Sequence, residues 1–307
     1  MTNLSPIDKS LLAQIADMHS IPEGSYNIRK NGKCLDRKSY SDIEIIPKTD
    51  KSGIDIIVKP NVKNKSVHIP VIITETNLTD LVYNDFYIGE NADVLIVAGC
   101  GIHNTGKHTS RHDGIHTFHL SKNSRVKYIE KHLGVGNAGD KVLNPITEIE
   151  MANDSYFEME TIQLGGVSSS VRTTNAKLYD GAKLSIKERI LTTEKQSAVT
   201  NFNVNLLGKN SSVDVVSRSV AKDDSHQSFN SNIIGQNECF GHVECDGLLT
   251  GNAKISSTPK IDAENVNATL EHEAVIGKIA GDQLIKLLTL GLSKTEAENM
   301  IIKGFLK

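Results

Sequence analysis

Apolar and polar residues alternate along most of the chain, from about Tyr40 to Glu273. Ile43 and Ile45 open the pattern, and clusters of Asn, Gly, Asp and Lys separate its stretches. Such alternation is typical of strands that bury one face, and the separating clusters have the composition of turns. The pattern therefore predicts a mainly β protein with many short strands.

A turn of similar composition recurs within this region. An Asn or Gly is followed by a small or polar residue and then by alternating apolar positions, starting at Asn91, Asn123, Asn153, Gly181, Asn210 and Asn252, with a looser copy at Asn237. The first five starts lie 32, 30, 28 and 29 residues apart. A period near 30 with strand alternation indicates a β-solenoid, whose stacked rungs share one core. Because the spacing drifts, a β-sandwich with Asn-rich hairpins remains the alternative.

Helices are expected at both ends of the chain. Ser5 is a favourable N-cap, Pro6 suits the first helical position, and Asp8 follows three residues after the cap. Near the C-terminus, Leu284, Leu287 and Leu288 share a helical face, and the segment from Ser293 to Glu296 has the form of a capping box. We expect an N-terminal helical segment at 1–39, a β-helix core at 40–275 and a C-terminal helical segment at 276–307.

The composition narrows the range of partners. The 307 residues include 34 Lys and Arg against 37 Asp and Glu, for a net charge of −3. This balance favours neither nucleic acid nor an anionic membrane as a partner. The first residues do not resemble a signal peptide, and the longest apolar run, Val94–Ile102, is far shorter than the roughly 20 residues that cross a bilayer. We expect a cytoplasmic protein, and its four cysteines form no CxxC pair.

Two segments could carry chemistry. The first contains Cys100, His103, His112 and His116, with His108 and His119 nearby. A thiolate and several imidazoles could hold zinc or iron. However, the spacing matches no standard finger, and Gly114 argues against a helix that presents His112 and His116 together. Turn and surface histidines with ordinary hydrogen bonds are the alternative.

The second segment combines Cys245 with Glu271, His272 and Glu273. Cys245 shares strand parity with Val243, so its side chain should point inward, and His272 has the parity of Leu270. An inward cysteine is commonly just a small core residue, and the ionisable triplet could be a salt-bridged strand end. From spacing alone, these residues support only a weak metal hypothesis.

These same segments resemble the SufB/SufD family of iron–sulfur cluster assembly scaffolds. The matching stretches lie at 98–104, 112–116, 244–251, 270–279, 282–284, 291–297 and 300–305. The resemblance is most specific in the C-terminal stretches, which begin with Leu-Glu-His-Glu-Ala-Val-Ile-Gly-Lys-Ile. It extends from about residue 88 to the end of the chain.

The resemblance implies a right-handed parallel β-helix with helical ends that assembles a transient 4Fe–4S or 2Fe–2S cluster. Cys245 would accept persulfide sulfur or ligate the cluster, and Glu273 and His272, with Glu271 as a further candidate, would ligate iron at a subunit interface. The expected partners are a SufC-like ABC ATPase at the C-terminal helices, a cysteine desulfurase and a second copy of the chain. ATP hydrolysis would belong to the ATPase, so the chain itself is not expected to be an enzyme.

The chain departs from the longer SufB pattern in two places. It has no cysteine-rich N-terminal extension, and the loop after Gly251 lacks the cysteine and histidine often found there. These departures leave open how many ligands each chain supplies. Two other functions remain as alternatives: an exported β-helix polysaccharide lyase or hydrolase, and an inert structural partner subunit with a buried Cys245.

Overall fold

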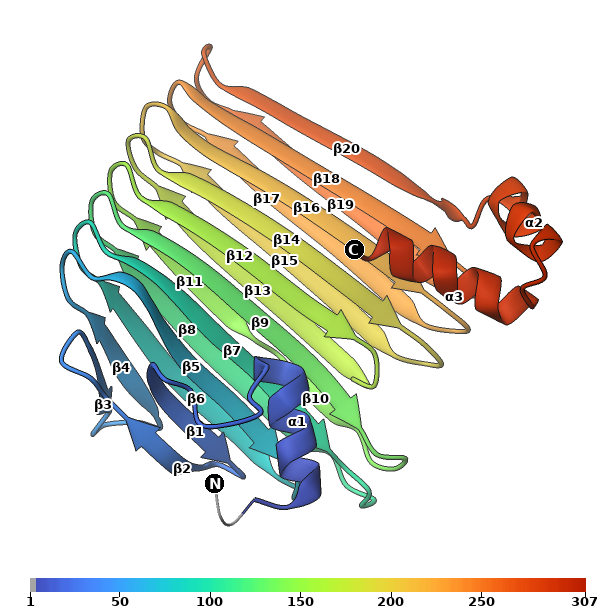
Figure 1. Cartoon of the computed structure of the whole chain (residues 1–307). Coiled ribbons are helices and arrows are strands. Elements are labelled where there is room, and N and C mark those ends of the chain that lie inside the picture. Colours follow the sequence, from blue (N-terminus) through green and yellow to red (C-terminus); the bar gives the residue numbers. More distant parts are fainter. Residues whose placement is uncertain (1–3) are drawn as a thin grey trace.

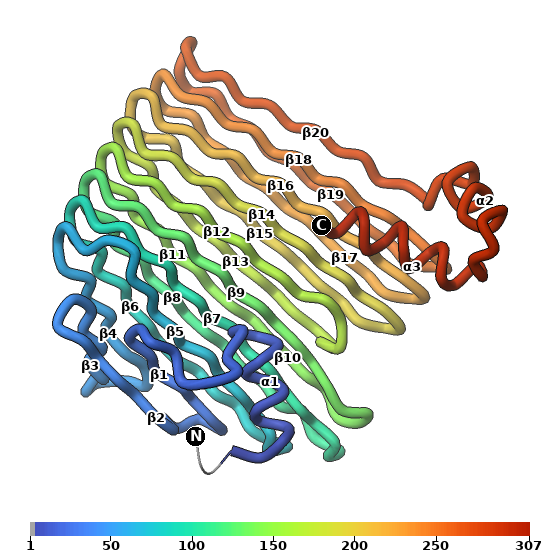
Figure 2. Tube along the Cα trace, viewed as in Figure 1, coloured from blue at the N-terminus to red at the C-terminus, as the bar shows by residue number. Residues whose placement is uncertain are grey.

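The computed structural model describes residues 4–307, so the first three residues of the predicted N-terminal segment lie outside it. The chain forms a β-solenoid of about eight turns with short helices at both ends, which confirms the predicted β-helix (Figure 1). It passes back and forth between two stacked sheets, as the tube in Figure 2 shows. Within residues 4–307, none of the helices has the length and apolar character needed to cross a bilayer.

Each turn of the solenoid contributes strands to two sheets, named sheet A and sheet B. Pairing is parallel except in two N-terminal pairs, β1 with β2 and β3 with β4. Sheet A holds, in spatial order, β2 (Lys33–Lys38), β1 (Ser25–Lys30), β5 (Lys63–Ile73), β7 (Asp93–His103), β9 (Arg125–Val135), β12 (Tyr156–Leu164), β14 (Lys183–Thr192), β16 (Ser211–Ala221), β18 (Cys239–Leu249) and β20 (Thr269–Lys278). Sheet B holds β19 (Lys254–Ala263), β17 (His226–Gly235), β15 (Ser197–Leu206), β13 (Ser169–Leu178), β10 (Lys141–Leu143), β8 (Ser110–Leu120), β6 (Thr79–Ile88), β4 (Gly53–Val58) and β3 (Ile43–Pro47), and β11 (Ile146–Met151) pairs with both β8 and β13.

The recurring Asn and Gly positions form the corners at which the chain passes from sheet B to sheet A. Asn91, Asn123, Gly181 and Asn210 have positive φ, a conformation that Gly and Asn adopt at little cost. The corners also stack, because the Asn123 side chain donates a hydrogen bond to that of Asn91 (3.3 Å). Asn252 belongs instead to the opposite edge, between β18 and β19, so the looser copy at Asn237 is the true continuation of the series.

The core lies between the two sheets and is built from the inward-facing residue of each alternating pair. Aromatic side chains stack from rung to rung, with the rings of Phe86 and Phe118 4.2 Å apart at their centroids. Parallel in-register stacking places like residues above one another, so each rung buries the apolar face of the next.

The N-terminal region differs in part from the expected helical segment at 1–39. Helix α1 (Pro6–Ala16) begins at the predicted N-cap Ser5, which forms a capping box with Asp8, and packs on the outer face of sheet A. Strands β1 and β2 occupy the rest of the range, joined by Asn31-Gly32 with positive φ at both residues. An Asn-Gly pair between alternating residues is a strong local hairpin signal, and pairing of β1 with β5 fixes this hairpin to the solenoid.

The C-terminal region contains helices α2 (Gly281–Thr289) and α3 (Lys294–Phe305). The predicted capping box is present, because Ser293 and Glu296 exchange hydrogen bonds. Ala297 and Ile302 of α3 are buried, whereas α2 buries none of its residues. Figure 1 shows α2 standing away from the body of the solenoid.

Candidate functional site

Cys245 lies on the inner face of β18, near the C-terminal end of the solenoid. Its side chain is completely buried, in agreement with the inward orientation predicted from its parity with Val243. The strand register pairs it with Ser217 of β16 and Ala274 of β20. Since only β20 lies beyond β18 in sheet A, Cys245 is one strand away from the end of the sheet.

His272 lies on the inner face of β20, beside the core residue Val243. Both of its ring nitrogens are buried and have no hydrogen-bond partner among residues 4–307. Burial, together with the neighbouring His242, lowers the pKa of His272 and favours the neutral imidazole. A neutral imidazole has a free lone pair and is the form that binds metals.

Glu271 and Glu273 lie on the opposite, outer face of β20, and both are exposed. Glu273 is the strand neighbour of Glu244 in β18, so two carboxylates stand side by side there. One chain therefore does not gather the predicted residues around a single point. Across the described part of the chain, no group of three or more His, Cys, Asp or Glu side chains is placed to hold a metal ion.

A column of polar residues runs along the inner face of sheet A above Cys245. The register aligns Glu130, Thr161, Glu188, Ser217 and Cys245 on successive strands. The Oγ atom of Ser217 donates a hydrogen bond of 2.8 Å to Oε2 of Glu188. The hydroxyl of Ser217, the strand neighbour of Cys245, is thus already directed toward the Glu188 carboxylate.

Glu188 receives a second hydrogen bond from sheet B, from Oγ1 of Thr200 at 2.9 Å. Burial raises the pKa of Glu188, and Arg172 opposes this shift. The sequence reasoning did not identify Glu188. Its parity with Ile186 and Ile190 was the available signal, because a carboxylate among inward apolar residues requires partners.

The thiol of Cys245 is held in its neutral form by these surroundings. Burial raises its pKa to about 11, the nearby Ser257 hydroxyl opposes the shift, and the Glu188 carboxyl adds to it. A thiolate, rather than a thiol, is the nucleophile and the metal ligand. In the single chain, Cys245 is therefore a protonated thiol at neutral pH.

Farther from Cys245, a buried ion pair crosses the core. The guanidinium of Arg172 on β13 donates hydrogen bonds to Glu130 and to Nδ1 of His132 on β9. Although burial opposes it, Arg172 and His132 hold the pKa of Glu130 well below its usual range. Such a pair is costly to break, because loss of one partner leaves a buried charge uncompensated.

The histidine-rich segment is divided by the fold. Cys100, His112 and His116 line a small internal cavity of about 10 Å³ together with His132, whereas His103 is not among its lining residues. The imidazoles of His112 and His116 converge over Gly114, where an added Cβ would lie 3.3 Å from the Nε2 atom of each ring. A cavity of this size holds about one water molecule.

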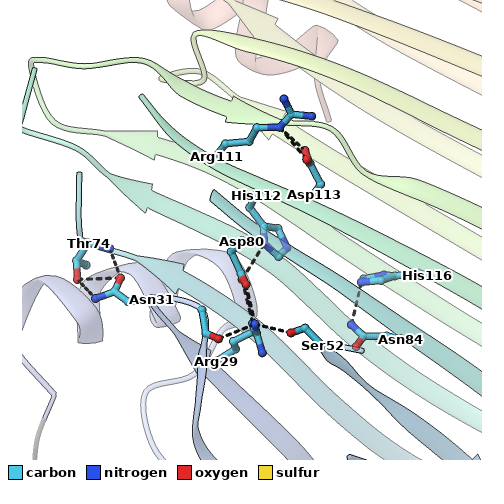
Figure 3. A network of polar contacts seen from close by, with 11 residues as sticks. Arg29, Asn31, Ser52, Thr74, Asp80, Asn84, Arg111, His112, Asp113 and His116 are labelled. Atoms are coloured by element: carbon cyan, nitrogen blue, oxygen red, sulfur yellow. Dashed lines mark hydrogen bonds and ion pairs between the residues drawn. The ribbon is translucent and has the colours of Figure 1, made fainter. Parts of the chain in front are cut away.

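Side chains of the same chain already contact the two histidines His112 and His116, as Figure 3 shows in part. Asp80 accepts hydrogen bonds from Arg29 and interacts with Nδ1 of His112 at 3.2 Å. The two ring nitrogens of His116 contact the Tyr128 hydroxyl (2.7 Å) and the Asn84 amide (3.2 Å). These contacts favour a structural role over the metal hypothesis for this segment.

A groove lies between the C-terminal helices and the end of β18. It has a volume of about 660 Å³, and its lining includes Leu248 of β18, Leu287 of α2 and Phe305 of α3. On α2, Ile285 and Leu288 are exposed. The terminal helices thus leave an apolar surface uncovered in the single chain.

Comparison with known proteins gives the chain a family context. It is 29% identical over 242 residues to an iron–sulfur cluster assembly SufBD family protein homologue of Methanothermobacter thermautotrophicus (strain Winter), matching 77% of this chain and 57% of the relative. It is 26% identical over 289 residues to an iron–sulfur cluster assembly SufBD family protein of Methanocaldococcus jannaschii, matching 92% of this chain and 90% of the relative. The chain therefore spans little more than half of the Methanothermobacter relative.

The family model of the SufBD core domain, described as part of SUF system FeS cluster assembly, matches residues 73–305. This range includes the solenoid from the end of β5, Cys245, His272 and both C-terminal helices. Membership supports a role in iron–sulfur cluster assembly. By this match, the chain belongs to the SufBD family.

Proposed function

We propose that the chain is a scaffold on which an iron–sulfur cluster is assembled at the C-terminal end of the solenoid. The observation that supports this most directly is the pair of unpartnered, buried ring nitrogens of His272, on the same inner face as Cys245. Buried polar atoms normally have partners. A buried imidazole without a hydrogen-bond partner, on the strand next to that of the inward-facing Cys245, is consistent with a site that is completed when an iron–sulfur cluster binds.

Each residue has a distinct role in this proposal. Cys245 accepts sulfur from a persulfide donor such as a cysteine desulfurase, or ligates the cluster. His272 and Glu273 bind iron, with Glu271 as a further candidate. Thiolate, imidazole and carboxylate together suit iron without fixing a cluster permanently. Bound iron would also favour the thiolate, since a coordinating thiol loses its proton.

The proposal includes pairing of two copies. Sheets A and B end at β20 and β19, whose outer edges pair with no other strand of the described chain. Unpaired strand edges are ready to pair with another chain, and inward residues such as Ile261 are partly exposed there. A cluster commonly has about four protein ligands. A two-fold pair would double Cys245, His272 and Glu273 and form two equivalent sites, each with Cys245 and His272 of one copy and Glu273 of the other.

The same proposal assigns the C-terminal groove to a SufC-like ABC ATPase. The exposed apolar residues of α2 and the groove beside Leu248 support a protein partner here. ATP hydrolysis belongs to that partner, and the scaffold itself is not an enzyme in this proposal. A cytoplasmic location is consistent with these partners.

A second candidate is an inert structural subunit, favoured by the complete burial of Cys245. Anaerobic reconstitution with ferrous iron and sulfide separates the two. We expect visible absorbance of a bound cluster for the unmodified chain and none for Cys245→Ser, with Cys34→Ser and Cys239→Ser as controls that retain it. A normal cluster on Cys245→Ser would show that this site is wrong, and no cluster on any chain would favour the inert subunit.

A further inference from the structure

Two serines lie near Cys245, and their hydroxyls differ in what they already bind. Ser217 is the strand partner of Cys245 in sheet A, and its hydroxyl donates to Glu188 at 2.8 Å. A serine has one O–H donor. Ser217 therefore has no donor left for a group attached to Cys245.

Ser257 belongs to β19 in sheet B, and its register with the core residue Phe229 places it on the inner face. Its hydroxyl lies close enough to Cys245 to favour the thiolate. The Oγ atom is nevertheless buried and makes no hydrogen bond of normal geometry within residues 4–307. A buried donor without an acceptor is costly, so an acceptor is expected when the site is occupied.

A neutral thiol is a weak hydrogen-bond acceptor, whereas an anionic sulfur is a strong one. Persulfide transfer to Cys245 creates such a sulfur. The donor persulfide is anionic. The Cys245 thiolate attacks its outer sulfur, the donor's S–S bond breaks, the donor leaves as a thiolate that takes up the proton lost by Cys245, and the donor's negative charge remains on the sulfur now carried by Cys245. One S–S bond forms as one breaks, so there is no net oxidation.

We propose that Ser257 is a sulfur-binding residue whose hydroxyl donates a hydrogen bond to the anionic sulfur carried by Cys245. This inference rests on the proposed function, because it assumes that Cys245 holds sulfur. The two sides of Cys245 are then unlike: the Glu188 side presents a carboxylate with its serine already engaged, and the Ser257 side presents a free donor. Ser257 would orient the sulfur away from Glu188.

The test compares variants that differ only in the hydroxyl group. Ser257→Thr retains the hydroxyl, and Ser257→Val has nearly the same shape as the threonine variant but no hydroxyl. Ser231→Ala is the matched control, because Ser231 is another buried, unpartnered serine of sheet B that lies in a different inward column, in register with Pro259. Each full-length chain is treated anaerobically with inorganic polysulfide, and persulfide at Cys245 is followed by alkylation and peptide mass mapping.

We expect the Cys245 persulfide to persist in Ser257→Thr and Ser231→Ala as in the unmodified chain, and to be lost about tenfold faster in Ser257→Val, the effect of one hydrogen bond to a charged group. Equal lifetimes in Ser257→Val and Ser257→Thr, whether long or short, would overturn this inference alone. A comparable loss in Ser231→Ala would also overturn it, as general loosening of the core. No persulfide on the unmodified chain would overturn the inference together with sulfur acceptance by Cys245.

Discussion

Cys245 and Glu273 project from opposite faces of sheet A although they lie on neighbouring strands. The register pairs Cys245 with Ala274 and Glu273 with Glu244, so the thiol points into the core while the carboxylate points outward. Within one chain, the sheet itself separates the two groups. If both bind the same cluster, they must come from different copies of the chain or the last strand must rearrange.

Mixed pairs of variant chains distinguish these two cases. When a Cys245→Ser chain pairs with a Glu273→Ala chain, a shared site still finds one intact cysteine and one intact glutamate from different copies. We expect such pairs to retain about half of the iron and sulfide bound by the unmodified pair, because a two-fold pair has two equivalent sites. Metal and sulfide analysis of affinity-separated mixed pairs measures this.

The control pairs an unmodified chain with one carrying both substitutions. Each shared site then lacks either its cysteine or its glutamate, because the doubly substituted chain supplies neither, so we expect almost no bound cluster. The opposite pattern, with cluster retained only in this control, would show that each site is built within one chain.

Pairing of two copies through β19 and β20 predicts sensitivity at Ile261. This inward residue is 46% exposed in the single chain. Ile261→Asp should weaken self-association about ten- to a hundredfold, because burying the exposed half of the side chain contributes about 0.7–1.4 kcal/mol in each copy and a symmetric interface counts it twice. Analytical ultracentrifugation measures the change. Leu164→Asp, on the outer face of β12 away from β19 and β20, is the control, and an unaffected Ile261→Asp pair would place the interface elsewhere.

Docking of an ATPase on the C-terminal helices predicts a loss of binding without a loss of folding. Ile285 and Leu288 are exposed on α2, which buries no residue of its own. The double substitution Ile285→Asp with Leu288→Asp should therefore abolish co-elution with a SufC-like ATPase and leave the thermal unfolding temperature unchanged. Leu164→Asp, on the outer face of sheet A, should bind normally. Full binding by the double variant would place the docking surface elsewhere.

The buried histidines predict a stability that falls as the pH is lowered. Burial lowers the pKa of His116 from 6.5 to about 4, so the unfolded chain takes up a proton between these values while the folded chain does not. Stability is therefore lost as pH falls from about 6.5 to 4, by up to about 1.4 kcal/mol per pH unit. His116→Gln should flatten this slope in denaturant titrations.

Part of the slope should remain in His116→Gln, because burial also lowers the pKa of His132. His119→Gln provides the control, since His119 lies on the solenoid surface with a side chain that is 40% exposed. It should keep the full slope. A slope that is identical in His116→Gln and the unmodified chain would contradict the assignment of this pH dependence to His116.

Several features follow from local sequence alone. The capping boxes at Ser5 and Ser293 depend on residues three positions apart, and both are present. Strand alternation likewise determines which face a residue occupies, and it places Cys245 and His272 inward as predicted. Family resemblance adds the identity of the chain, which neither alternation nor spacing supplies.

Other features were misjudged because their signal is weak or shared. The Asn31-Gly32 hairpin lies within the range 1–39 that was expected to be helical, although the helical signals of that range all belong to α1. Asn252 resembles the other corner residues, yet it lies on the opposite edge of the solenoid. Both edges require turn residues of the same kind, so composition cannot tell them apart.

Only the tertiary structure decides which inward residues stand above one another. Alternation assigns Glu188, Ser217 and Cys245 to the inner face, but their alignment in one column depends on the length of every corner between them. A change of one residue in a corner would shift the register and move each side chain to the other face. The placement of Ser257 across the core from Cys245 also depends on how the two sheets stack. The sequence therefore determined the faces and the caps, and the packing of distant strands determined the site.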